Sequence, residues 1–211
     1  VGRYNGGFNL NIKEGKLNFF SAYNVNQATY DVEGYTIREN FRNDDFIGGF
    51  RQDNLNTQGR LFQFGRFGFD YQLSNRNLLT LSQSFGGGNF DMDDSQTFSQ
   101  VNGSNAVIST GTQTNTQANF WRNSTTQLLF KHNAPKEGKE WTADLTYNRS
   151  RNGTDALYDL RTYDLNGVLL PNMPRLQKND GAGKNQVLTF QFDYVDPLTS
   201  NTKLEWGVRS N

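Results

Sequence analysis

Apolar and polar residues alternate along eight stretches of the chain, so that each stretch gathers its apolar side chains at every second position. Odd positions between residues 17 and 25 carry Leu17 and Phe19, for example, and even positions between 185 and 194 carry Phe190 and Phe192. A period of two is that of a β-strand with one apolar and one polar face. The stretches cover residues 4–13, 17–26, 59–73, 78–85, 119–132, 140–150, 186–195 and, at the end, 203 onward. The pattern predicts an all-β fold of about eight antiparallel strands.

Short and long connections alternate between these strands. The short ones, rich in turn formers, are residues 14–16, 74–77, 133–139 and 196–201, and Gly15 can supply the positive φ of a tight turn. The long ones are 27–58, 86–118 and 151–185, rich in Asn, Gly, Ser, Thr and Asp. This rhythm is typical of an antiparallel transmembrane β-barrel with short periplasmic turns and long external loops.

The chain does not begin with Met, and its last residues stop inside an alternating pattern. We therefore expect residues 1–211 to be part of a single outer-membrane β-barrel domain whose N- and C-terminal parts, including any plug, are missing. A run of about eighteen apolar residues, as a membrane-spanning helix requires, does not occur in the sequence.

The two faces of the predicted strands differ in charge. The apolar positions carry no Asp, Glu, Lys or Arg through the middle of each strand. A lipid-facing Arg or Lys at mid-depth costs about 2–4 kcal/mol, so this uncharged face suits lipid and the other suits an aqueous lumen. The predicted lipid-facing residues are Phe8, Leu10, Ile12, Phe19, Tyr23, Phe67, Phe69, Tyr71, Leu79, Leu81, Leu128, Phe130, Trp141, Leu145, Tyr147, Leu188, Phe190, Phe192, Tyr194, Leu204 and Trp206. The predicted lumen-facing residues are Asn9, Asn11, Asn18, Asn24, Arg66, Asp70, Thr80, Ser82, Gln127, Lys131, Asp144, Asn148, Gln191, Asp193, Glu205 and Arg209.

Aromatic residues lie near both ends of the predicted membrane-crossing strands. Near the short turns they are Tyr71, Trp141, Tyr194 and Trp206, and near the opposite ends they are Tyr23 and Tyr147. Two such groups resemble the aromatic girdles at the two interfaces of a membrane.

The composition narrows these possibilities. Only 34% of residues are hydrophobic and the mean hydropathy is -0.78, yet 14% are aromatic. Soluble domains carry more apolar residues and disordered chains fewer aromatic ones, whereas a barrel wall needs only a thin apolar skin. The net charge of zero argues against a nucleic-acid partner, and the lack of cysteine excludes disulfides and thiolate metal sites. Alternation alone also fits a soluble β-sandwich or adhesin-like binding module with its apolar faces inward.

Candidate chemistry is sparse. Asp91, Asp93 and Asp94 form a weak calcium candidate, because Ca²⁺ prefers several carboxylate oxygens, but the spacing lacks the Gly and the distal Glu of an EF-hand. We favour a solvated acidic loop. His132 is the only histidine and has no nucleophile motif beside it, so we expect an interfacial polar residue, no enzyme and no cofactor.

Several strand and turn patterns carry a family resemblance. Residues 2–23 combine a Gly-rich first strand, the turn Lys13-Glu14-Gly15-Lys16 and an aromatic second strand ending in Ser21-Ala22-Tyr23, and residues 69–77, 138–145 and 192–198 look similar. They resemble barrel strands of the outer-membrane β-barrel family related to TonB-dependent receptors.

The resemblance implies a larger barrel in the outer membrane of a Gram-negative-type envelope, with an internal plug, that takes up ligands using energy passed on by TonB. The partners it implies are outer-membrane lipid, the rest of the barrel with its plug, TonB and a surface lipoprotein. Some such barrels instead serve as scaffolds in secretion or assembly complexes, and this alternative stays open.

Overall fold

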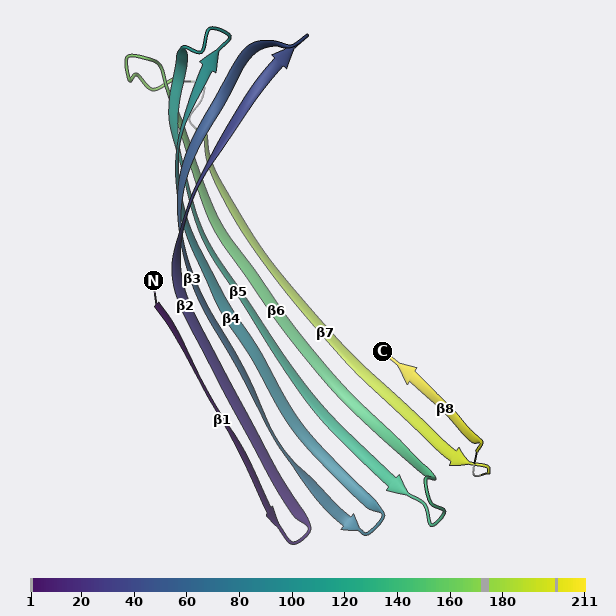
Figure 1. The fold of residues 1–211 in the computed structure, drawn as a ribbon. Helices are drawn as coiled ribbons and strands as arrows, with labels where there is room; N and C mark the ends of the chain where they lie inside the picture. Colours follow the sequence, from purple (N-terminus) through teal and green to yellow (C-terminus); the bar gives the residue numbers. More distant parts are fainter. Residues whose placement is uncertain (1, 172–174, 200) are drawn as a thin grey trace.

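The computed structural model describes residues 2–171, 175–199 and 201–211 as one sheet of eight strands. The strands are β1 (Gly2–Glu14), β2 (Leu17–Arg42), β3 (Asp45–Ser74), β4 (Asn77–Asn102), β5 (Val107–Asn133), β6 (Glu140–Tyr163), β7 (Arg175–Pro197) and β8 (Lys203–Ser210). Each pairs antiparallel with the next in chain order. Figure 1 shows the result as a long curved wall with β1 and β8 at its edges. The predicted all-β, antiparallel fold class is confirmed.

The predicted short turns are present at one end of the sheet (Figure 1). Between β1 and β2, Glu14 pairs with Leu17, and Gly15 has a φ of 56°, which suits a residue without a side chain. The turns before β4 and β6 also fall where the sequence places them. Of the last turn, residue 200 lies outside the described residues, but β7 and β8 end and begin on either side of it.

The prediction of long irregular loops is wrong. β2 continues to Arg42 and β3 starts at Asp45, so only Asn43 and Asp44 connect them. Both have positive φ, 50° and 70°, as the two central residues of a type I′ hairpin turn require, and Asn and Asp tolerate this conformation. Most of residues 27–58 is therefore strand. Polar side chains on both faces remove the alternation by which a strand is recognised, so composition alone suggested a loop.

The other two long connections are shorter than predicted for the same reason. β4 extends to Asn102 and β5 begins at Val107, while β6 extends to Tyr163 and β7 begins at Arg175, with residues 172–174 outside the described ones. The longest strand, β3, has 30 residues, or about 100 Å at the usual rise per residue. A tilted strand crosses a bilayer in about 9–11 residues. The strands are therefore long enough to continue well beyond a membrane.

The sheet has no hydrophobic core in the described part of the chain. No large side chain there is fully buried, and Ala28 and Ala156 are the buried hydrophobic residues. A soluble β-sandwich needs two sheets with a packed interior, and the described residues form a single sheet. In these same ranges, no helix is long and apolar enough to pass through a membrane.

Candidate membrane-facing surface

The strand register places the two predicted residue sets on opposite faces of the sheet. Residues paired directly across neighbouring strands share a face, and successive residues of a strand alternate between faces. One row of directly paired residues runs Ile12, Phe19, Phe69, Leu81, Leu128, Leu145, Phe190. The row on the other face beside it runs Lys13, Asn18, Asp70, Thr80, Leu129, Asp144, Gln191, Arg209. We call these the apolar face and the polar face.

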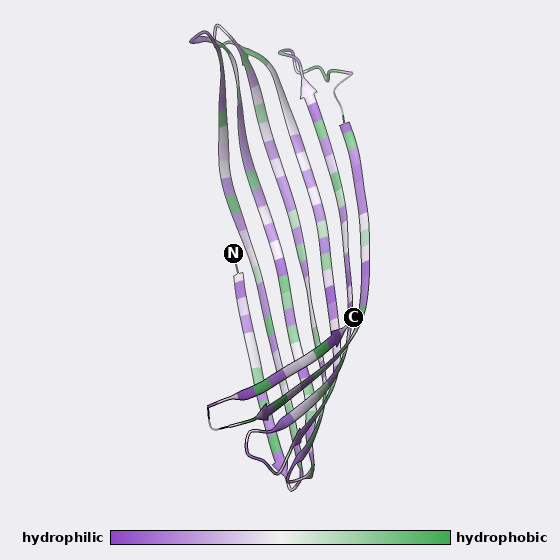
Figure 2. Ribbon diagram, turned by 90° about the vertical axis from the view of Figure 1, so that its right-hand side faces the viewer, coloured by the Kyte–Doolittle hydropathy of each residue, from purple (hydrophilic) through white to green (hydrophobic). Residues whose placement is uncertain are grey.

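The apolar face is the more exposed of the two. Along β5, Thr126 and Leu128 of the apolar face are exposed, whereas Gln127 and Leu129 of the polar face are half-buried. Among the described residues, the buried ones other than glycine all lie on the polar face: Ala28, Thr80, Ser82, Asp94, Ser109, Ala156 and Thr162. Such a difference in exposure is expected of a curved sheet, because side chains crowd together on its concave side and spread apart on its convex side. Figure 2 shows hydrophobic and hydrophilic positions alternating along the strands of this curved wall.

Aromatic rings form a continuous group on the apolar face of β5 to β8, near the short turns. Trp141 lies 5.1 Å from Phe130 and 5.7 Å from Phe192 between ring centroids. Trp206 in turn lies 5.4 Å from Phe192 and 5.7 Å from Tyr194. Trp and Tyr prefer the membrane–water interface because their rings are apolar and carry one polar group. This arrangement therefore suits a membrane boundary just inside the short turns.

The single histidine belongs to the same group. The His132 ring is 5.6 Å from that of Trp141, and its Nδ1 lies 2.6 Å from Oδ1 of Asn77 in the neighbouring strand. Asn77 and its directly paired His132 sit at the β3–β4 turn end of the sheet. These contacts fit a polar residue at an interface.

Polar side chains on the apolar face are hydrogen-bonded to one another. Gln83 accepts a hydrogen bond from the Thr126 hydroxyl at 2.5 Å and donates to Oγ of Ser124 at 2.9 Å. The Tyr23 hydroxyl donates to Oε1 of Gln63 at 2.7 Å. Hydrocarbon offers no hydrogen-bond partner, so such groups are tolerated in a membrane only when satisfied internally. Gln83, which interrupts the apolar positions of β4, was not among the residues predicted from the sequence.

The polar face carries a hydrogen-bond network between neighbouring strands. Asp70 accepts from Asn18 at 3.2 Å and from the Thr80 hydroxyl at 2.7 Å, which links β2, β3 and β4. Asp144 accepts from Gln127 and from Thr146, which links β5 and β6. Such carboxylates and amides suit a face in contact with water.

The structure does not bring the three calcium-candidate carboxylates together. Asp91, Asp93 and Asp94 lie within β4, not in a loop, and Asp94 points to the face opposite Asp93. The Asp94 carboxylate instead accepts from Gln96 at 2.5 Å. In the described ranges, no group of three or more His, Cys, Asp or Glu residues is placed to hold a metal ion.

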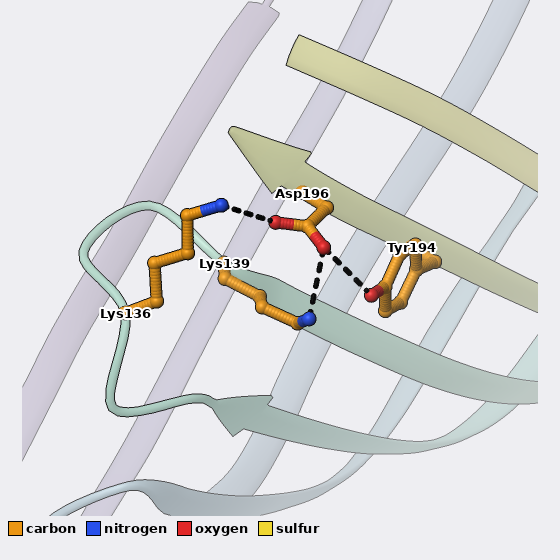
Figure 3. Close-up of polar contacts among 4 residues, drawn as sticks. All are labelled: Lys136, Lys139, Tyr194 and Asp196. Atoms are coloured by element: carbon orange, nitrogen blue, oxygen red, sulfur yellow. Dashed lines mark hydrogen bonds and ion pairs between the residues drawn. The ribbon is translucent and has the colours of Figure 1, made fainter. Parts of the chain in front are cut away.

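A cluster of charged side chains links the β5–β6 turn to the end of β7 by hydrogen bonds and ion pairs (Figure 3). Asp196 accepts hydrogen bonds from Lys139 at 2.8 Å, Lys136 at 3.0 Å and the Tyr194 hydroxyl at 3.2 Å. The hydrogen bond from Lys139, followed by that from Lys136, lowers the pKa of Asp196 to about 2, and the bond to Asp196 raises the pKa of Lys139. This turn cluster (Lys136, Lys139, Tyr194 and Asp196) was not predicted from the sequence, because its partners are nearly 60 residues apart.

A single curved antiparallel sheet with one exposed apolar face and one polar face is the architecture of a transmembrane β-barrel wall. Residues 132–211 match the model of the outer membrane protein beta-barrel family, from the end of β5 through β8. The match indicates the outer membrane as the location of the chain. No curated protein was found to match the chain.

Proposed function

We propose that this chain forms part of the wall of an outer-membrane β-barrel, with the apolar face toward lipid and the polar face toward an aqueous lumen. The observation that carries the proposal is the exposure of the apolar face. Leu81, Leu145 and Phe190 are 37%, 42% and 45% exposed, in a sheet where no described large side chain is fully buried. Water does not favour such a surface, whereas lipid does.

Within this class, we propose TonB-linked uptake of a ligand as the role of the complete barrel, without enzymatic activity. The strand and turn patterns that resemble TonB-dependent receptors support this role, and so does a polar face that suits a water-filled passage. The partners would be TonB, a plug and a surface lipoprotein. Crosslinking to TonB in cells would support uptake, whereas stable co-purification with a secretion complex would favour the scaffold role instead.

The membrane orientation is tested by placing arginine on either face at the same depth. Leu145→Arg puts a charge on the apolar face of β6, and its neighbour Thr146→Arg puts one on the polar face beside Asp144. We expect only Leu145→Arg to block insertion into liposomes, because a lipid-facing Arg costs about 2–4 kcal/mol at mid-depth. Insertion is measured as a folded band that shifts on heating in gel electrophoresis. Equal insertion of the two variants, or a wild-type protein that is soluble without detergent, would contradict the proposal.

A further inference from the structure

Four basic residues lie together on the same side of the sheet as the apolar face, directly beyond its uncharged part. They are Arg122 on β5, Arg149 and Arg151 on β6, and Lys184 on β7, and we call them the basic cluster. Arg122 pairs directly with Arg151, and Arg151 pairs directly with Lys184. All four side chains are exposed. Arg149 is two positions from Tyr147 on the side away from the short turns, so the cluster begins where the uncharged surface ends.

Like charges directly opposite one another destabilise a sheet. Among the ion pairs of the described residues, none joins a carboxylate to a member of the basic cluster. The Arg122 guanidinium instead donates to the Gly88 carbonyl at 2.7 Å and to Oδ1 of Asn89 at 2.8 Å. Uncharged acceptors do not cancel its charge. The cluster thus offers several positive charges for which an anion from outside the chain would be the natural complement.

The basic cluster also borders a hollow in the surface. Arg122, Arg149 and Arg151 line a hollow of about 430 Å³ together with Phe85 and Gly87. Gly87 leaves room for Arg122, since a Cβ there would meet Cδ of Arg122 at 2.8 Å. Phe85 lies on the apolar face, which continues from it toward the short turns. Positive charge at one end and an apolar surface at the other match a molecule with an anionic head and hydrocarbon tails.

We propose that the basic cluster binds the phosphate groups of a phosphorylated lipid in the outer leaflet, with the acyl chains lying along the apolar face past Phe85. This inference rests on the proposed function, which turns this face toward lipid and the short turns toward the periplasm. Arginine suits the role because its planar guanidinium donates two parallel hydrogen bonds to a phosphate. A position just past the uncharged band corresponds to headgroup depth, where basic residues attract anionic lipids.

The test compares lipid binding by the detergent-purified protein and two double variants. Arg149→Gln/Arg151→Gln removes two charges from the cluster, and Arg60→Gln/Arg66→Gln removes two from the polar face as a matched control. Each protein is titrated with diphosphorylated lipid A, with the same lipid after removal of its phosphates, and with inorganic phosphate as competitor. Bound lipid is counted by native mass spectrometry. We expect the cluster variant to bind diphosphorylated lipid A about 30-fold more weakly and the control to bind it unchanged. The reason is that each basic residue contributes roughly one order of magnitude or less to the affinity for an anionic lipid.

Each outcome decides the inference. Wild-type affinity in the cluster variant, or equal binding of the dephosphorylated lipid, would overturn it. Displacement of the lipid by millimolar inorganic phosphate would also overturn it, because the site would then be one for free phosphate. If the wild-type protein enters bilayers but one of these results is obtained, the barrel proposal stands and only the lipid site is ruled out. A wild-type protein that is soluble without detergent would overturn both the barrel proposal and the lipid site.

Discussion

At the residue scale, phenylalanine rings lie over glycines that are directly paired with them across the strand. The pairs are Phe20 with Gly68, Phe62 with Gly88, Phe85 with Gly65, Phe98 with Gly111, and Phe120 with Gly153. Each ring occupies the space where a side chain at the glycine would stand. It covers backbone that the glycine leaves exposed, an arrangement known to compensate for glycine in a strand. The glycines are therefore part of the packing of the wall.

Gly153→Ala tests this packing. A Cβ at Gly153 would overlap the Phe120 ring, so we expect a loss of about 1–3 kcal/mol in the free energy of unfolding, as for other overpacked positions. Urea unfolding in detergent, followed by tryptophan fluorescence, measures the loss. Gly59→Ala is the matched control, because nothing lies within 4 Å of a Cβ there. Adding Phe120→Ala to Gly153→Ala should recover part of the loss, and a control variant as unstable as Gly153→Ala would contradict the explanation.

At the scale of strands and turns, the turn cluster makes a pH-dependent contribution. The pKa of Asp196 falls to about 2 in the folded protein, from about 3.9 in an unfolded chain, so its stabilisation is complete above about pH 4 and is lost as the pH falls toward 2. The pKa of Lys139 is raised, so its contribution is complete below about pH 10.4 and is lost as the pH rises beyond its folded pKa. The cluster should therefore act in full between about pH 4 and pH 10.

Asp196→Asn tests this pH dependence. We expect the variant to have a lower melting temperature than the wild type at pH 7, because Lys136 and Lys139 lose their anionic partner. The difference should shrink as the pH falls from 4 toward 2, where the wild-type carboxylate also becomes protonated. Melting temperatures in detergent at pH 7, 4 and 2.5 provide the comparison. Glu137→Gln removes a charge from the same turn and should show neither effect; a difference independent of pH would argue against the role of the Asp196 charge.

The halves of the strands near the short turns were predictable from the sequence, and the halves at the opposite end of the sheet were not. Around Phe67 and Phe69 the apolar positions alternate with Arg66 and Asp70, because one face meets lipid or core and the other meets water. From Gly34 to Arg42 both faces of β2 meet water, so hydrophobicity loses its period although the backbone pairing with β3 continues. Alternating Tyr30 and Val32, or the Asn43-Asp44 turn pair, would have indicated a strand and a tight turn.

The turn cluster and the basic cluster could not be predicted from the sequence for another reason. Lys139 and Asp196 meet because β6 pairs with β7 in one particular register, and Arg122, Arg151 and Lys184 form a row for the same reason. Register depends on turn geometry and on the pairing of whole strands, so it is not visible within any single strand. The assignment of the two faces needed only parity, which is why both predicted residue sets fall on separate faces.

At the scale of the whole molecule, the wall is open. In the part of the chain that the structure describes, β1 and β8 pair only with β2 and β7. Unpaired backbone N–H and C=O groups are not tolerated in hydrocarbon, and closed barrels satisfy them by pairing every strand on both sides. In the membrane, we therefore expect both edges to be paired, either with strands outside residues 1–211 or with one another.

The orientation of the wall can be tested by cysteine labelling, because the sequence has no cysteine of its own. Ser104→Cys lies in the β4–β5 turn at the far end, and Arg76→Cys lies in the short β3–β4 turn. We expect a membrane-impermeant maleimide to label Ser104→Cys on intact cells, and Arg76→Cys only after the outer membrane is permeabilised. Leu81→Cys should stay unlabelled in both cases, because lipid covers the apolar face at that depth.

The same labelling distinguishes a wall that is inverted in the membrane from one that does not span the membrane. Thr57 lies on β3 about ten residues beyond Phe67, farther from the short turns than a membrane-crossing segment needs to reach. Thr57→Cys should therefore react on intact cells like Ser104→Cys, which would show that these strands rise beyond the outer surface. If Arg76→Cys reacts instead and Ser104→Cys does not, the wall is inverted and the basic cluster faces the inner leaflet. If all four positions react on intact cells, Leu81 included, the apolar face is not covered by lipid and the wall does not span the membrane.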